Sequence, residues 1–270
     1  MIVFPPCKIN LGLYVTQKRN DGYHDIESVF YPVPWFDVLE IIEAPDQQFE
    51  FRCSGIHLDT GQTGNIVEKA YHLFRETYSI PEVKIHLHKI IPSGAGLGGG
   101  SSDAAWALVA LNKLFSFGLD ITTLAGHAAS LGSDCPFFVY NSPMLVTGRG
   151  ENLHPISLSL KGKVVVIVYP EIHIGTKEAY ERLTPQAPTF DLSHLPNLPM
   201  SEWQTSLSND FEKSATSRYE IIGNIKIQLK SKGAIYSSMS GSGSAVYGLF
   251  DHPVDSGTWF PGMKSWQGVL

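Results

Sequence analysis

A cluster of glycines in the first half of the chain restricts the possible folds more than any other feature. Residues 92–100 contain five glycines and separate an alternating strand pattern at 83–91 from a helical pattern at 102–115. Glycine tolerates positive φ angles and lets another group approach the backbone closely. Free amides in such a loop, together with the partial positive charge of a helix N-terminus, can hold an anion. The segment therefore predicts a phosphate-binding loop, and a loop that is only flexible is the weaker alternative.

Three well-known phosphate loops do not fit this segment. Gly94, Gly96 and Gly99 have the spacing of the dinucleotide fingerprint, but Asp120, the acidic residue at the required distance, precedes a predicted helix. A Walker A loop needs a lysine before its serine or threonine, and this segment has none. The glycine loop of protein kinases joins two strands, whereas this one enters a helix. The pattern indicates a phosphate loop of another kind.

A lysine and an asparagine near the start of the chain form a second candidate site. Lys8 and Asn10 are two residues apart on a predicted strand, so their side chains point to the same face. On a buried face they would be available to a site, and on an exposed face they would be ordinary solvated surface. Both interpretations stay open on the sequence alone. Tyr23 and His24 follow in a segment that, by itself, is typical of a hairpin turn.

Two further polar loops have both a functional and a structural interpretation. Asp134 lies between a predicted helix and an apolar stretch, where it could accept a proton or simply form a turn or cap a helix. Residues 240–244, Ser-Gly-Ser-Gly-Ser, could face a phosphorylated ligand or form a plain hairpin turn. His86 and His88 share a strand face, but no third ligand lies at a suitable spacing, so a metal site is not favoured.

The remaining patterns predict an α+β chain, because strands and helices alternate without strict βαβ order. Predicted strands cover 9–16, 26–31, 38–43, 48–53, 83–91, 137–140, 144–148, 163–169, 234–239 and 245–250. Predicted helices cover 66–78, capped by Asn65, and 102–115, 120–131, 176–182, 211–218 and 221–232. The proline-rich stretch 184–199 indicates a loop or an insertion, and the tail after Asp251 has no strong pattern.

Composition excludes several classes of protein. The 270 residues carry a formal charge of −6, which disfavours a general nucleic-acid binder. Three widely spaced cysteines indicate neither a disulfide framework nor a zinc site, and they fit a reducing compartment. The start of the chain lacks a secretory pattern, and no apolar run is long enough to span a bilayer. We expect a cytoplasmic protein with no membrane partner.

Several of these stretches occur together in one order. They are Lys8-Ile9-Asn10-Leu11, Asp21-Gly22-Tyr23-His24, Gly96 to Ala105, Gly132 to Phe138, Asn209-Asp210-Phe211-Glu212 and the Ser-Gly-Ser-Gly loop. In this combination the chain resembles the GHMP family of small-molecule kinases over nearly its whole length. The resemblance implies an α+β, two-domain GHMP kinase fold. An N-terminal domain at 1–155 would contain a left-handed βαβ crossover, and a C-terminal domain at 156–270 would be ferredoxin-like.

The resemblance also implies an activity. The chain would be an ATP-dependent kinase that moves the γ-phosphoryl group, with Mg²⁺ screening charge, to an alcohol. The detailed motifs imply that the acceptor is the 2-hydroxyl of the methylerythritol unit of a cytidine diphosphate alcohol, in the non-mevalonate route to isoprenoid precursors. The partner is therefore a small molecule, and the protein would be a monomer or a homodimer.

Site residues follow from the family pattern. Asp134 corresponds to the base that accepts the hydroxyl proton, and Lys8 to the residue that orients and charge-balances it. The positions implied to bind ATP are Asn65, Pro92, Ser93, Gly94, Ala95, Gly96, Leu97, Gly98, Gly99, Gly100, Ser101 and Ser102. The positions implied to bind the acceptor are Asn10, Tyr23, His24, Thr176, Tyr180 and Gly241, with Tyr23 and His24 near the cytosine and Tyr180 stacking on it. The resemblance identifies no metal ligand.

The chain departs from the family pattern at Ser93 and Ala95, where related loops are often richer in glycine and contain methionine. This departure leaves the detailed phosphate contacts open. Alternative functions also stay open on the sequence. Within the family the alternatives are a mevalonate- or homoserine-type kinase and a diphosphomevalonate decarboxylase. Outside it, the alternatives are a dinucleotide-dependent oxidoreductase and a binding protein that has lost catalysis, which the presence of both Lys8 and Asp134 disfavours.

Overall fold

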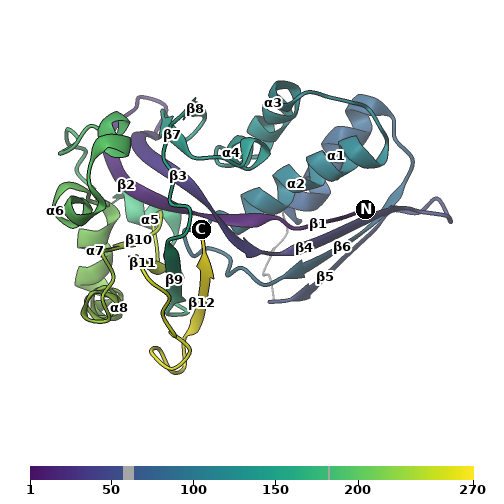
Figure 1. Ribbon diagram of the computed structural model, residues 1–270. Coiled ribbons are helices and arrows are strands. Elements are labelled where there is room, and N and C mark those ends of the chain that lie inside the picture. The colour runs from purple at the N-terminus through teal and green to yellow at the C-terminus, as the bar shows by residue number, and fades with distance from the viewer. Residues whose placement is uncertain (57–63, 182) are drawn as a thin grey trace. The chain divides into compact units, whose positions relative to one another are not determined.

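The computed structural model describes residues 1–56, 64–181 and 183–270, which form two compact units (Figure 1). The first unit consists of Met1–Cys7, Trp35–Ser93 and Gly98–Ser142, and the second of Lys8–Pro34, Gly94–Leu97 and Pro143–Leu270. Each unit is assembled from separate stretches of the chain. The predicted domain boundary between residues 155 and 156 is a single cut in the sequence, whereas these units combine several stretches. The boundary stays a prediction.

The first unit is a four-stranded sheet with helices on one face (Figure 1). The strands, in spatial order, are β1 (Ile2–Val3), β4 (Val38–Glu43), β6 (Val83–Lys89) and β5 (Glu50–Gly55). The helices are α1 (Ile66–Tyr78), α2 (Gly99–Leu114), α3 (Ile121–Leu131) and α4 (Cys135–Tyr140). The α+β prediction is confirmed.

A crossover connection joins the two parallel strands of this sheet. β5 pairs with β6 in parallel, and α1 lies between them in the chain. Parallel neighbours need such a connection because a tight turn reverses the chain. Alternation places Val83, Ile85 and Leu87 of β6 in the core, as the sequence predicts. The βαβ unit is thus present, and its left-handedness stays a prediction.

The prediction of a strand at 137–140 is wrong. These residues belong to helix α4, which starts at Cys135 and ends before Asn141, a residue with a φ of 48°. A short apolar run does not distinguish a buried strand from a buried helix. Pro136 stands in the first helical turn, where its missing N–H has no cost, so it starts the helix and does not exclude it.

The second unit contains two sheets. In one, β2 (Pro6–Lys18), β3 (His24–Phe36), β7 (Met144–Thr147) and β8 (Asn152–Pro155) lie in that order, although the first residues of β2 and the last of β3 group with the first unit. The predicted turn after β2 is confirmed by a hydrogen bond from the Arg19 amide to the Tyr23 carbonyl at 2.8 Å. The sequence pattern does not predict β8, because the four residues of this strand are largely exposed and lack a clear apolar alternation.

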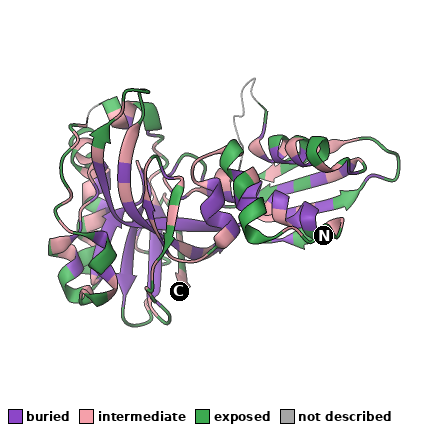
Figure 2. Ribbon diagram, turned by 90° about the horizontal axis from the view of Figure 1, so that it is seen from above, coloured by how far each residue is buried: buried purple, intermediate pink, exposed green. Residues whose placement is uncertain are grey.

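The other sheet has the strand order of a ferredoxin-like domain. β10 (Tyr236–Met239), β11 (Val246–Phe250), β9 (Val164–Tyr169) and β12 (Lys264–Val269) are all antiparallel neighbours in that order. Numbered along the chain, this order is 2-3-1-4, which is the split-βαβ arrangement. The described residues 251–263, between β11 and β12, form turns and no helix. Nearly all residues of β9, β10 and β11 are buried, and Figure 2 colours buried residues purple.

Helices complete the second unit. They are α5 (Thr176–Glu181), α6 (Trp203–Ser206), α7 (Phe211–Arg218) and α8 (Glu220–Ser231), with 3₁₀ turns at Leu192–Asn197 and Met200–Glu202. α8 packs on β10 and β11 through Ile222, Ile225 and Leu229. The predicted end of the helix at 176–182 includes Arg182, which lies outside the described residues.

Two stretches without a clear sequence pattern have defined roles in this unit. The tail supplies β12, an edge strand whose alternation is weak because its residues are half-buried or exposed. The proline-rich stretch forms a 3₁₀ turn that buries Leu192 and Leu195. A side chain at Gly12 would meet Leu192 at 2.9 Å, so this turn covers β2. The interpretation of 184–199 as only a loop is therefore incomplete.

Candidate active site

Two glycine motifs that are about 145 positions apart in the sequence meet in the second unit. Ser240 Oγ donates a hydrogen bond to the Gly96 carbonyl at 2.8 Å, and the Ala245 amide donates to the Ala95 carbonyl at 3.0 Å. A Cβ on Gly96 would lie 1.9 Å from the Ser240 oxygen, and the φ of Gly96 is +79°. Only glycine fits such a contact and such a conformation. The Ser-Gly-Ser-Gly loop therefore supports residues 94–97 of the glycine-rich loop.

Lys8 and Asn10 lie on the buried face of β2, which decides between the two interpretations of their position. Their exposed fractions are 3% and 1%. Lys8 Nζ donates to Asn10 Oδ1 at 2.5 Å and lies 4.4 Å from the centre of the Phe30 ring. Asn10 Nδ2 in turn donates to Ser28 Oγ at 2.9 Å. A buried ammonium needs such partners, because its hydration is lost.

The backbone around this pair is tied to both glycine motifs. The Lys8 amide donates to the Leu97 carbonyl at 2.9 Å, and Ser240 Oγ lies 3.4 Å from Asn10 Oδ1. Tyr247 donates its hydroxyl proton to the Asn10 carbonyl at 2.6 Å. The second unit thus brings together Lys8, Asn10, residues 94–97 and the loop that contains Gly241.

The motif at 209–212 positions the Ser-Gly-Ser-Gly loop. Asn209 Nδ2 donates to the carbonyls of Met239 and Gly241, both at 2.9 Å. Glu212 Oε1 accepts from the Met239 amide at 2.7 Å and from Ser238 Oγ at 2.8 Å. Asn209 and Glu212 are not among the predicted site residues. The available signal was that both are polar residues near the start of a predicted helix. The sequence does not show their partners, which lie some 30 residues away in the chain.

In the first unit, the other half of the glycine-rich loop opens helix α2. Gly98 is the N-cap with a φ of +71°, and the Ser102 amide donates to its carbonyl at 2.9 Å. The preceding amides of the first turn have no acceptor within the helix. Ser102 Oγ is buried and has no hydrogen-bond partner among the described residues. A Cβ on Gly100 would meet no described atom within 4 Å, so this turn has an open side.

Asp134 lies close to the start of α2, because the next residue, Cys135, is hydrogen-bonded to Ser101 of that helix. Burial raises the pKa of the Cys135 thiol to about 12; a hydrogen bond with Ser101 opposes this shift, and the nearby Asp134 carboxylate adds to it. α4 packs against α2. Within the first unit, the segment that contains Asp134 therefore lies beside the turn formed by residues 98–102.

Asn65 has a structural role in the first unit. Its Oδ1 accepts from the Val67 amide at 2.9 Å, and the Glu68 carboxylate accepts from the Asn65 amide at 3.0 Å, which completes a capping box. The predicted N-cap is confirmed. Because Oδ1 is used by the cap, a ligand contact from this side chain would come from its amide nitrogen.

An aromatic stack lies on the predicted acceptor side of the second unit. The rings of His24 and Tyr180 are stacked with centroids 4.8 Å apart, and Phe211 meets Tyr180 edge-on at 4.9 Å. Burial, together with the charge of Lys18, lowers the pKa of His24. Tyr23 is 57% exposed, and the Arg149 guanidinium lies 5.0 Å from its ring. The fold thus joins His24 to Tyr180 and places Tyr23 against Arg149.

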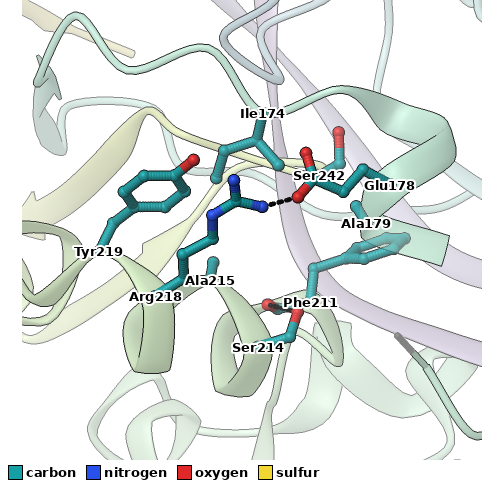
Figure 3. Close-up of a pocket in the computed structure, with 9 residues that line it drawn as sticks. All are labelled: Ile174, Glu178, Ala179, Phe211, Ser214, Ala215, Arg218, Tyr219 and Ser242. Carbon is teal, nitrogen blue, oxygen red and sulfur yellow. Dashed lines mark hydrogen bonds and ion pairs between the residues drawn. The ribbon is translucent and has the colours of Figure 1, made fainter. Parts of the chain in front are cut away.

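A small pocket in the second unit includes Phe211 in its lining (Figure 3). It contains about 290 Å³ of free space, part of it open to solvent. An ion pair between Arg218 and Glu178 crosses it, and Phe211, Ala179 and Ile174 supply apolar walls (Figure 3). Of the predicted acceptor residues it includes none, although Ala179 precedes Tyr180 and Ser242 follows Gly241.

Within 1–56, 64–181 and 183–270, no three or more His, Cys, Asp or Glu side chains form a group that could hold a metal ion. In the same part of the chain, no helix has both the length and the apolar character to cross a membrane.

Comparison with known proteins gives matches over nearly the whole chain. The model of the GHMP kinases N terminal domain matches residues 65–142, and that of the GHMP kinases C terminal domain matches 197–257. The 4-diphosphocytidyl-2-C-methyl-D-erythritol kinase of Bacteroides fragilis is 48% identical over 252 residues, which are 93% of this chain and 92% of that protein.

Solved structures give the same picture. A crystal structure of 4-(cytidine 5'-diphospho)-2C-methyl-D-erythritol kinase matches with a TM-score of 0.79 and 31% identity, over 92% of this chain and 90% of that one. Homoserine kinase from Cytophaga hutchinsonii matches with a TM-score of 0.74 over 100% of this chain and 93% of that one. Its identity is 17%, which shows a shared fold alone.

Proposed function

This chain belongs to the GHMP kinase family, and from that membership we propose that it phosphorylates 4-diphosphocytidyl-2-C-methyl-D-erythritol with ATP. The phosphoryl group would go to the 2-hydroxyl of the methylerythritol unit, a step toward isoprenoid precursors. One observation carries the choice of substrate: 48% identity to a kinase of that name over 93% of the chain. The likeness to homoserine kinase concerns the fold, so a homoserine-type activity is not favoured.

The triphosphate would bind at residues 92–102. The amides at the start of α2 and the open side at Gly100 suit an anion, as does the buried, unpartnered hydroxyl of Ser102 among the described residues. Mg²⁺ is usually held by phosphate oxygens, waters and one or two carboxylates, so the lack of a preformed acidic cluster in the described residues agrees with this site. When bound, the ion would neutralise phosphate charge.

Asp134 and Lys8 would do the chemistry. As the substrate oxygen forms its bond to the γ-phosphorus and the bond to ADP breaks, the hydroxyl proton would pass to the Asp134 carboxylate. Lys8 would orient the hydroxyl and balance the charge. Its burial beside Asn10 and Phe30 supports this role, because a fixed ammonium in a water-poor site acts more strongly than a solvated one.

The cytidine diphosphate part of the acceptor would bind to the second unit. We assign the cytosine to the side chains of His24 and Tyr180, with Tyr23, Asn10, Thr176 and Gly241 as further contacts. The existing His24–Tyr180 stack supports this assignment, since a planar base can take the same kind of contact. We further propose a cytoplasmic monomer or homodimer that acts on small molecules. The net charge of −6 disfavours a nucleic-acid partner.

The substrate assignment is tested by ADP release. Purified protein, ATP and Mg²⁺ are combined with the cytidyl alcohol, with homoserine or with mevalonate. We expect turnover with the cytidyl alcohol and a kcat/KM at least about 10³-fold lower with homoserine and mevalonate. A site that hydrogen-bonds the cytidyl group is left with unpaired polar groups when a substrate without that group binds. Turnover with homoserine or mevalonate alone would reject the proposal, and tight NADH binding without ATP binding would favour an oxidoreductase.

Replacing Tyr180 by Ala is expected to raise the KM for the cytidyl alcohol by about 10-fold, because base–aromatic stacking contributes about 1–3 kcal/mol. The KM for ATP should change by less than about twofold. Tyr180→Phe is the matched variant, because it keeps the ring and removes the hydroxyl. Steady-state kinetics with each substrate varied in turn measures both constants. Equal increases in the two KM values would remove Tyr180 from the acceptor site.

A further inference from the structure

Three ionisable side chains are enclosed together in the first unit. Lys89 is the last residue of β6, Asp37 immediately precedes β4, and Asp103 belongs to α2. Lys89 Nζ donates to an oxygen of Asp37 and to Asp103 Oδ2, the latter at 2.7 Å. The side chains of Lys89 and Asp37 are 0% exposed and that of Asp103 is 2% exposed. Burying three ionisable groups is costly, so the arrangement calls for a functional explanation.

The cluster is attached to both ends of the glycine-rich loop. Before the loop, Asp37 Oδ1 accepts hydrogen bonds from the amides of Ile90 and Ile91, the second at 2.9 Å. After the loop, a Cβ on Gly99 would lie only 3.3 Å from Lys89 Nζ. The first residue of α2 therefore packs directly on the ammonium group. The side chains of the cluster fix the strand that enters the loop and the helix that leaves it.

We propose that Lys89 is a positioning residue for the phosphate loop, and that the proton on Asp103 sets the charge behind that loop. The proposal rests on the proposed ATP-dependent function and deepens it. Lys89 fixes the first turn of α2 and adds positive charge to the N-terminus of that helix, which favours a bound phosphate. Loss of the Asp103 proton adds one negative charge at the same place and opposes phosphate binding.

The surroundings of Asp103 disfavour its ionised form. Its Oδ1 is buried and has no hydrogen-bond partner among the described residues, so a charge there is only partly compensated. Burial raises the pKa of Asp103 to about 8; the Lys89 ammonium opposes the shift and the Asp37 carboxylate adds to it. Below that pH the acid is neutral, and above it the cluster gains a negative charge. ATP should therefore bind more weakly as the pH rises through about 8.

Other ionisable groups also lie on the elements around α2, among them the amino group of Met1 before β1, which donates to the Ile41 carbonyl at 2.7 Å. Burial raises the pKa of Tyr71 on α1 well above its usual range and that of Cys135 on α4 to about 12. Burial also raises the pKa of Cys53 on β5. His127 on α3 is hydrogen-bonded to Tyr78, and Asp134 precedes α4.

The deciding experiment measures ATP binding to Asp103→Asn between pH 7.5 and pH 9.5. Calorimetry with MgATP, without the alcohol, gives the Kd at each pH for the wild type and the variant. We expect the wild-type Kd to rise about fivefold over this range, because the ionised Asp103 carboxylate repels the bound phosphates. The Kd of the variant should change less than twofold. Asp46→Asn, which removes an exposed carboxylate paired with Lys84, should keep the wild-type slope. Parallel slopes for Asp103→Asn and the wild type would overturn the role of the proton.

A second variant tests the positioning role of Lys89. Lys89→Met should raise the Kd for MgATP by about tenfold or more. Lys84→Met, which changes a half-buried lysine on the same strand, should leave the Kd unchanged. Thermal unfolding is recorded for each protein. If Lys89→Met does not fold, the pH profile of Asp103→Asn decides the proposal. A folded Lys89→Met that binds ATP like Lys84→Met contradicts it.

The two proposals fail in different ways. A wild type that binds MgATP but does not turn over the cytidyl alcohol overturns the substrate assignment and leaves the inference about Lys89 and Asp103 in place. A wild type that turns over the alcohol, together with an Asp103→Asn variant of unchanged pH slope, overturns only the inference.

Discussion

Asp134→Asn is expected to lower kcat by about 10²–10⁴-fold, the range that a positioned general base contributes. The asparagine amide has nearly the same shape as the carboxylate but does not accept the hydroxyl proton. Because ATP would be held at residues 92–102, its KM should change by less than about threefold. Coupled ADP release measures kcat and KM, and calorimetry with MgATP gives an independent Kd.

The matched control is Asp120→Asn. Asp120 caps α3 by accepting a hydrogen bond from the Thr123 amide, and asparagine caps helices about as well as aspartate. This variant should keep wild-type kcat. An Asp134→Asn enzyme that turns over at close to the wild-type rate would show that another group takes the proton, and a loss of ATP binding in that variant would instead indicate a role in the nucleotide site.

Gly96→Ala is expected to reduce kcat/KM for ATP by at least about 10²-fold. A methyl group at this position would lie 1.9 Å from the Ser240 carbonyl oxygen, and a φ of +79° is unfavourable for alanine. The glycine-rich loop and the Ser-Gly-Ser-Gly loop therefore have to move apart. Displacement of a binding loop by about 1 Å is enough for a 10²-fold loss. Initial rates at varied ATP concentration give the effect on activity.

Gly126→Ala provides the control for this substitution. Gly126 lies within α3, and a Cβ there would meet no described atom within 4 Å, so alanine should be neutral or slightly stabilising in the helix. Thermal unfolding separates a local effect from general instability. A Gly96→Ala protein with wild-type kinetics would mean that the contact between the two loops is not needed to bind ATP.

The local pattern of the chain predicted most of the regular structure. Alternation identified β6, and the polar residues Asn65 and Asp120 marked the starts of α1 and α3, where the structure has their capping hydrogen bonds. Local pattern failed where it was ambiguous. The apolar residues of α4 suit a buried strand equally well, and β12 has an exposed face that weakens its alternation.

The sequence predicted the individual segments of the candidate site but not the contacts between them. The sequence identified the glycine-rich loop, Lys8 and Asn10, but it left open whether the face that carries Lys8 is buried. The structure buries Lys8 and joins Gly96 to Ser240. It also shows that Asn209 and Glu212 hold the Ser-Gly-Ser-Gly loop. These contacts span about 30 to 145 residues, a separation at which periodicity carries no information.

The sequence by itself determined where most of the strands and helices and the glycine-rich loop lie, because side-chain periodicity, capping residues and glycine act over a few neighbouring residues. The tertiary structure alone decided that Lys89, Asp37 and Asp103 share one enclosed space behind α2. Each is a common charged residue that would be solvated in an extended chain. Their special environment arises only because the ends of two strands and the first turns of a helix pack around them and exclude water.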